Sequence, residues 1–178
     1  MDRFIALTAL VIILLLVNWS IHQKEEHLAN GKTAYLELAP VDPRSLMQGD
    51  YMALRFQLSR EVSNALPKNK KSRSWRHNID ASDGYVIVKL DEKNIASYKA
   101  LYTDQTLAKD EILMRYRVRN GAVKFATNAF FFQEGHAKVY EPARYGQFRV
   151  DSAGELLLVA MYDKELNRLA PTEEKLDP

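Results

Sequence analysis

The feature that most constrains this chain is an uncharged apolar stretch that runs from Phe4 to Ile21. As a helix, these eighteen residues are about 27 Å long, which is just enough to cross the hydrocarbon core of a bilayer. Trp19 suits the membrane interface. Arg3 precedes the stretch and charged residues follow at 24–26. The short leading end favours a signal anchor with its N-terminus in the cytoplasm.

A cleaved signal peptide is the competing interpretation of this stretch. Cleavage requires small residues at alternate positions, and neither Asn18-Trp19-Ser20 nor His27-Leu28-Ala29 provides them. We therefore expect a retained transmembrane helix at 4–21 after a cytoplasmic end at 1–3. A polar spacer at 22–32 continues the helix until Asn30-Gly31 ends it. The expected location is the bacterial inner membrane, crossed once, with the following domain in the periplasm or extracytoplasmic space.

The remaining chain has the length of one domain, which we place at 33–163, with a C-terminal tail at 164–178. The 25 basic and 23 acidic residues give a net charge of +2, which argues against a nucleic-acid partner. There is no Cys, so neither a disulfide nor a thiolate metal site can form. The four His residues are scattered, so no metal site is expected, and no motif indicates a cofactor.

Alternation of apolar and polar residues predicts most of the secondary structure of this domain. The fold class expected is α+β and β-rich, a single domain with a mostly antiparallel sheet and one or two short helices. The run 85–90 is apolar except for Lys89, so it should be a central strand. The expected strands are 33–39, 51–58, 85–90, 95–102, 111–119, 127–132, 147–151 and 155–162.

The strand at 51–58 follows a Pro-rich loop and a Gly-Asp turn. Its core face should carry Met52, Leu54, Phe56 and Leu58. A short helix is expected next, at 59–66, with Ser59 as its N-cap residue and a proline at its end.

Asn120-Gly121 is the strongest hairpin signal in the chain. A two-residue type I′ turn there pairs Val118 with Val123 and Tyr116 with Phe125. The opposite face is a basic strip, so water, acidic neighbours such as Glu37, or an anionic partner must offset its charge. The basic strip consists of Arg115, Arg117, Arg119 and Lys124.

Three consecutive Phe residues, at 130–132, imply that both faces of their strand are covered, by the core on one side and by a helix or a partner on the other. The segment 133–136 should open a short helix, and Pro142 is a position at which a helix can restart.

Two blocks of the sequence resemble the GDYXXLXY family of largely uncharacterised bacterial proteins. The first is Gly49-Asp50-Tyr51-x-x-Leu54-x-Phe56, in which Phe56 replaces the usual Tyr. The second includes Phe131-Phe132-Gln133-Glu134-Gly135 and the stretch from Glu141 to Val150. The resemblance extends from about Val41 to Met161. It implies a small membrane-anchored protein, often encoded beside a polytopic membrane protein, and it implies no catalytic residues.

Polar residues that border turns in these two blocks form a candidate binding site, which we call the turn cluster. They can be salt bridges that hold turns to the sheet, or a polar pocket where the opening loop meets the segment 134–149. The turn cluster consists of Asp42, Arg44, Gly49, Asp50, Tyr51, Glu134, His136, Arg144 and Arg149.

Three functions remain open from the sequence. The first is a membrane-anchored accessory or interaction protein that docks on a polytopic membrane protein. The second is an extracytoplasmic binding domain for an anionic ligand, which would use the basic strip or the turn cluster. The third is a hydrolase without a recognised motif, since neither a nucleophile elbow nor a phosphate-binding glycine loop is present.

Overall fold

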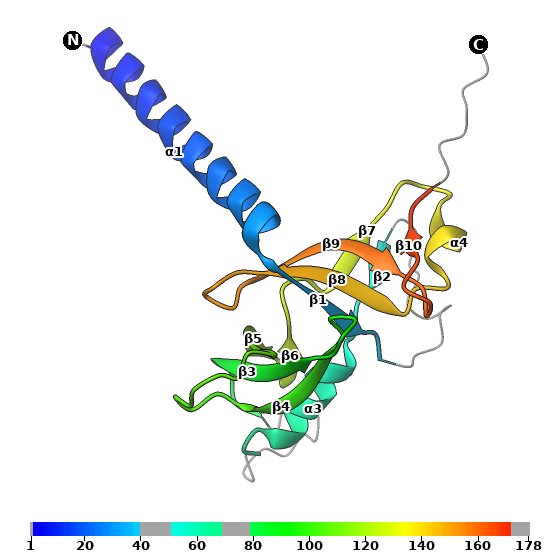
Figure 1. Ribbon diagram of the computed structural model, residues 1–178. Helices are drawn as coiled ribbons and strands as arrows, with labels where there is room; N and C mark the ends of the chain where they lie inside the picture. The colour runs from blue at the N-terminus through cyan, green and yellow to red at the C-terminus, as the bar shows by residue number, and fades with distance from the viewer. Residues whose placement is uncertain (1, 40–50, 69–78, 172–178) are drawn as a thin grey trace, which may run out of the picture.

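The N-terminal helix α1 stands away from a body of antiparallel strands (Figure 1). This computed structural model describes residues 2–39, 51–68 and 79–171. Within these ranges the elements are α1 (Asp2–Asn30), β1 (Lys32–Glu37), β2 (Tyr51–Ala53), α3 (Gln57–Ala65), β3 (Ser82–Leu90), β4 (Ala96–Leu101), β5 (Glu111–Arg119), β6 (Ala122–Lys124), β7 (Ala129–Phe131), α4 (Ala137–Tyr140), β8 (Tyr145–Val150), β9 (Leu156–Tyr162) and β10 (Arg168–Leu169).

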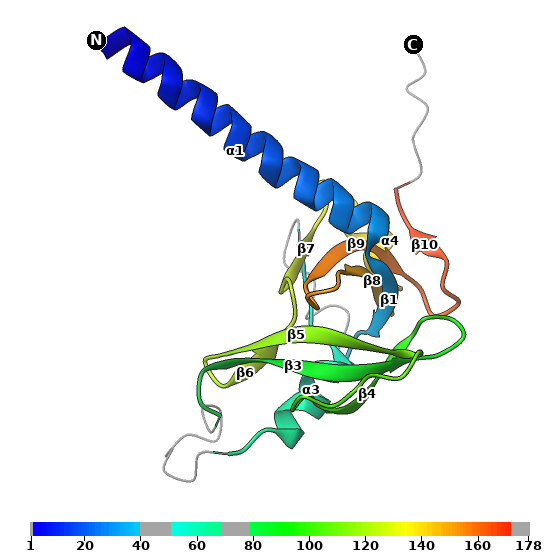
Figure 2. The ribbon, with the colours of Figure 1, turned by 60° about the vertical axis from the view of Figure 1, so that its left-hand side comes forward.

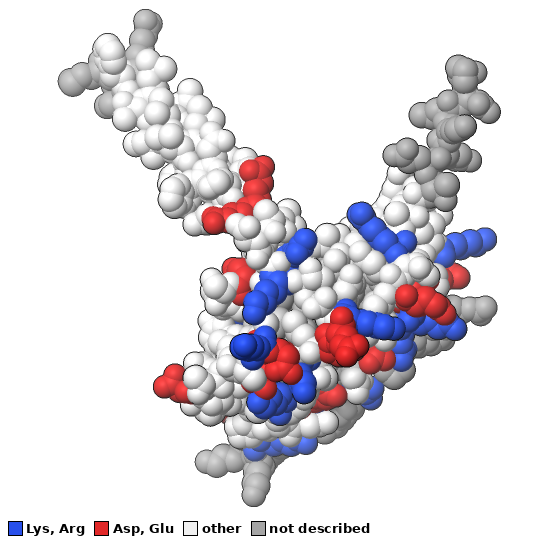
Figure 3. Space-filling view, viewed as in Figure 1, with Lys and Arg blue, Asp and Glu red and all other residues white. Residues whose placement is uncertain are grey.

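Helix α1 is long and apolar enough to cross a membrane, and its apolar window is not buried in the body. Figure 3 shows a largely uncharged rod, with acidic and basic side chains beginning near its base. The helix continues unbroken through the expected spacer and ends at Asn30, as predicted. Its last turn contacts β8, where His27 is buried.

The body contains two four-stranded sheets and one two-stranded sheet, all with antiparallel pairing. The first sheet has the order β1-β8-β9-β10, and the second has the order β4-β3-β5-β6. Strands β2 and β7 form the third. The predicted β-rich α+β class is therefore confirmed, and β3 is a central strand as expected, with Val86, Ile87 and Val88 buried.

One hydrophobic core joins these elements. Its fully buried side chains include Leu36 of β1, Met114 of β5 and Phe148 of β8. The ring of Phe148 meets the ring of Phe56 edge-on, with 5.4 Å between centroids. Helix α3 covers β4 and β6 and adds Leu58 and Val62 to the same core.

The predicted hairpin is confirmed. Asn120 and Gly121 have φ values of 53° and 69°, the left-handed pair that a type I′ turn requires. Val118 pairs with Val123 as expected. Strand β6 ends at Lys124, so the pair expected between Tyr116 and Phe125 lies beyond the strand, although both side chains are buried.

The strand expected over 51–58 is largely wrong. Only Tyr51–Ala53 is a strand, and α3 begins at Gln57, with the extended residue Phe56 rather than Ser59 at its N-cap. The four predicted core side chains are all buried. The burial pattern changes from alternate residues to a spacing of four, because Leu58 and Val62 both face the core from one helical face.

Three smaller expectations also need correction. The strand around the phenylalanines is limited to β7, and residues beyond Asp163 add β10 on the edge of β9. Pro142 does not restart a helix after α4. The chain turns there into β8, and the Arg144 amide bonds the carbonyl of Tyr162.

Candidate functional site

The turn cluster is only partly visible. Asp42, Arg44, Gly49 and Asp50 lie outside the described residues, so the contact expected between the opening loop and segment 134–149 stays a prediction. The described flanks of that loop do meet this part of the chain: β2 pairs with β7, and the Leu38 amide bonds the Arg144 carbonyl at 2.8 Å.

Arg144 forms an ion pair with Glu37, with 2.7 Å between Nη2 and Oε1. Both side chains are partly exposed. Glu37 also raises the pKa of nearby Glu61, although burial is the larger cause of that rise. Arg144 thus ties the end of β1 to the start of β8, which is a structural role. Glu37 and Glu61 were not predicted as members of this group, because their proximity arises from non-local packing.

Arg149 lies where α1 joins the body. Its guanidinium donates to the Gly31 carbonyl at 3.0 Å and to the Thr33 hydroxyl at 2.9 Å. The imidazole Nε2 of His27 lies 2.9 Å from the Arg149 carbonyl oxygen, and its Nδ1 lies 3.6 Å from a carboxylate oxygen of Asp151. We call these five residues the α1–β8 junction.

Space at the α1–β8 junction is tight. A Cβ at Gly31 would lie 2.5 Å from the His27 carbonyl oxygen and 3.0 Å from the Cβ of Arg149. Only glycine therefore fits between the helix end and β8. The sequence identified Asn30-Gly31 as a helix end, but the contact of His27 with β8 was not predicted. The position of His27 one turn before this helix end was the available signal.

His136 and Glu134 differ in their surroundings. Glu134 is exposed in the turn before α4. His136 is half-buried at the N-cap of α4, and its Nδ1 is buried without a hydrogen-bond partner among the described residues. The two residues are separated only by Gly135, but no contact brings their side chains to Arg144 or Arg149 in the described part of the chain.

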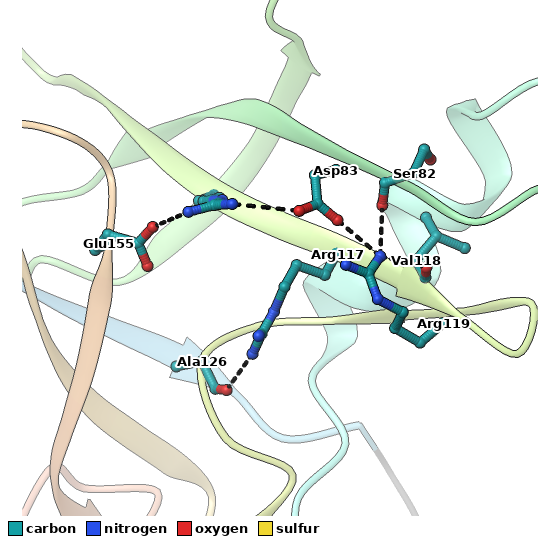
Figure 4. A network of polar contacts seen from close by, with 8 residues as sticks. Ser82, Asp83, Arg117, Val118, Arg119, Ala126 and Glu155 are labelled. Carbon is teal, nitrogen blue, oxygen red and sulfur yellow. Dashed lines mark hydrogen bonds and ion pairs between the residues drawn. The ribbon is translucent and has the colours of Figure 1, made fainter.

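Two of the four members of the basic strip, Arg115 and Arg119, are paired with carboxylates. Asp83 accepts from Arg119 at 2.7 Å and from Arg115 at 3.2 Å, and Arg115 also pairs with Glu155 (Figure 4). Hydrogen bonds from Arg119 and then Arg115 hold the pKa of Asp83 below its ordinary value. The acidic neighbours are therefore Asp83 and Glu155, and the expectation that Glu37 offsets this strip is wrong.

The other two members of the strip have no carboxylate partner among the described residues. Arg117 donates to the Ala126 carbonyl at 3.0 Å (Figure 4). Lys124 lies opposite Arg117 in the hairpin.

An aromatic surface lies at the paired ends of β2 and β7. Phe131 is 74% exposed, and its ring centroid lies 5.7 Å from that of Tyr51. Phe130 and Phe132 instead contact Tyr140 of α4, at 4.9 and 5.2 Å. The expectation that both faces of this strand are covered is thus wrong for Phe131, which no described segment covers. We call Tyr51 and Phe131 the β2–β7 aromatic pair.

A pocket of about 490 Å³ adjoins Phe131. Leucines of β9, Glu155 and two members of the basic strip, Arg115 and Arg117, also line it, so the pocket is amphipathic. No group of three or more His, Asp and Glu side chains in the described ranges could hold a metal ion.

Fold and site together define a class: an antiparallel β domain carried on one N-terminal helix that can cross a membrane. The chain belongs to the GDYXXLXY family, since the family model described as GDYXXLXY protein matches residues 13–161. No curated protein and no solved structure matches it.

Proposed function

We propose that this protein is a membrane-anchored accessory protein whose body docks on a polytopic membrane protein at the extracytoplasmic face of a bacterial inner membrane. Helix α1 supplies the anchor, which would confine the body to the membrane surface. The family resemblance, which implies a polytopic neighbour, supports the same choice of partner.

The observation that carries the proposal is the exposure of Phe131. Burying a phenylalanine side chain fully is worth about 1.5–3 kcal/mol, and no segment in the described part of the chain supplies that burial for Phe131. Aromatic residues are enriched where protein partners meet, and Tyr51 beside Phe131 enlarges the contact. Figures 1 and 2 show β7 rising toward the side of the body from which α1 leaves. A partner embedded in the same membrane would therefore meet this surface.

The α1–β8 junction supports the proposal in a second way. His27, Gly31 and Arg149 hold the helix end against β8, so the body cannot swing freely about α1. A fixed orientation reduces the entropy that docking would otherwise cost.

Photocrosslinking tests the proposal. Phe131 is replaced by benzoylphenylalanine in the full chain, which is expressed in a bacterium that encodes a member of this family. The same replacement at Leu107 is the control. Leu107 is 38% exposed and lies in the loop between β4 and β5. We expect a crosslink to a polytopic membrane protein from position 131 alone. Crosslinks to lipid only, or equal products from both positions, would count against docking at this surface.

Labelling tests the orientation. Because the chain has no Cys, single cysteines at Lys93 and at Arg3 can be compared in intact spheroplasts with a membrane-impermeant maleimide. We expect label at position 93 and none at position 3. Label at position 3 with protection at position 93 would show the opposite orientation. A mature chain that lacks residue 3 would show that the helix is not retained as an anchor.

A further inference from the structure

A long groove lies between α3, the hairpin strand β6 and the segment that leads from β2 into α3. Its volume is about 1070 Å³. Figure 1 shows α3 and β6 at the part of the body remote from α1, and neither member of the β2–β7 aromatic pair lines the groove. Ser63, Asn64 and Asn128 are among the polar residues of its wall.

The charge of the groove is one-sided. Arg55, Arg60 and Lys124 line it, and no Asp or Glu does. Arg55 and Arg60 are exposed and Lys124 is half-buried. Within the described ranges none of the three forms an ion pair, whereas Arg115, Arg119 and Arg144 are all matched to carboxylates. The groove therefore gathers three basic side chains that have no carboxylate partner among the described residues.

The groove also runs along a strand edge. Strand β6 is the last strand of its sheet and has β5 on one side only. In a two-residue hairpin, the residues that flank the turn exchange both hydrogen bonds, so the next residue turns its N–H and C=O outward. Arg119 and Ala122 flank the turn, and Val123 follows. Val123 thus presents a donor and an acceptor to the free edge, and in the described part of the chain no further backbone bond engages them.

We infer that this groove binds an extended acidic segment of a partner protein, which adds a strand to β6 and places its carboxylates against Arg55, Arg60 and Lys124. An exposed strand edge supplies sequence-independent backbone bonds, and pockets or charges beside it select the side chains. A volume at the upper end of the range for small-molecule sites, with an open strand edge, suits a peptide better than a single phosphate. This recognition is additional to the proposed docking at Phe131 and does not depend on it.

Fluorescence anisotropy tests the inference on the full chain in nonionic detergent. The probe is a fluorescein-labelled decapeptide of alternating Glu and Thr, and its counterpart has Gln at every Glu. We expect the acidic peptide to bind, with affinity that falls as salt rises, and the Gln peptide to bind at least about tenfold more weakly. Arg60→Glu should weaken binding about five- to tenfold, because it replaces attraction with repulsion. Lys93→Glu, an equal charge change at an exposed site outside the groove, should change it less than about twofold.

Two further experiments test strand addition and distinguish a peptide from a small anion. Peptides N-methylated at every Glu or at every Thr remove donors from opposite edges of the added strand, so pairing with β6 predicts that only one of them fails to bind. Equal behaviour of the two would overturn strand addition. Displacement of the peptide by inorganic phosphate at matched charge concentration would show a small-anion site and overturn the peptide assignment. Absence of binding by the acidic peptide, or equal loss in Arg60→Glu and Lys93→Glu, would overturn the inference as a whole.

Discussion

Replacing Gly31 by Ala should loosen the α1–β8 junction. The backbone at Gly31 does not have a positive φ, so conformation alone permits alanine there, and the reduced freedom of the unfolded chain would favour folding by about 0.4–1 kcal/mol. The added Cβ would lie 2.5 Å from the His27 carbonyl oxygen, however, which is backbone and has little room to move.

The overpacking at this position should cost about 1–3 kcal/mol, so the net effect should be a destabilisation of about 1–2 kcal/mol. The bond from the Gly31 amide to the His27 carbonyl, 2.9 Å in length, would lengthen or break. The bond from Arg149 to the Gly31 carbonyl should weaken with it.

Two measurements on the full chain in detergent check this prediction. Urea unfolding followed by circular dichroism gives the free energy, and spin labels on cysteines introduced at Gln23 and Glu92 report how firmly α1 is held. We expect one narrow distance distribution in the parent chain and a broader or displaced one in Gly31→Ala. Asn30→Ala is the control, because residue 30 is exposed and helical and alanine favours a helix. If Gly31→Ala is as stable as Asn30→Ala and keeps the narrow distribution, the steric argument is refuted.

Three other predictions follow from the packing and the ion pairs. Phe125→Ala should cost about 3–5 kcal/mol in urea unfolding because its side chain is 1% exposed, whereas Phe131→Ala should cost less than about 0.5 kcal/mol; similar losses would contradict the assigned burial. Asp83→Asn should weaken the acid dependence of stability. The pKa of Asp83 is lower in the folded chain than its ordinary value of about 3.9, so the carboxylate stabilises the fold at any pH above that ordinary value. This stabilisation is lost as the pH falls through the lower folded pKa. An unchanged acid arm in the stability curve would argue against these ion pairs. A double-mutant cycle on Glu37 and Arg144 should give a coupling of about 0.2–1 kcal/mol, and strictly additive losses would mean that the pair has no energetic role.

Local patterns predicted the elements whose side chains follow one period throughout. Asn120-Gly121 specified its own turn and the register of Val118 with Val123, because a two-residue loop leaves no alternative pairing. The prediction failed at Phe56. The alternating apolar pattern of a strand continues as far as Leu58, although the helix begins at Gln57, and Val62 is the first residue to show the helical spacing.

The site was harder to predict than the fold, because its contacts join residues distant in sequence. His27 and Arg149 are 122 positions apart, and Glu37 and Arg144 are 107 apart. Charge patterning alone indicated a basic strip. The carboxylate that pairs with Arg115 and Arg119, Asp83, comes from the neighbouring strand β3, and its register with β5 became known only from the fold.

The continuity of α1 up to its junction with β8 has a consequence for chain length. A helix turns by about 100° per residue, so one residue inserted before His27 would rotate the whole body about the helix axis by that angle and raise it by about 1.5 Å. The number of residues in α1 therefore sets the direction in which Phe131 faces within the plane of a membrane. Insertions or deletions of about seven residues, close to two full turns, would keep that bearing and change only the height of the body.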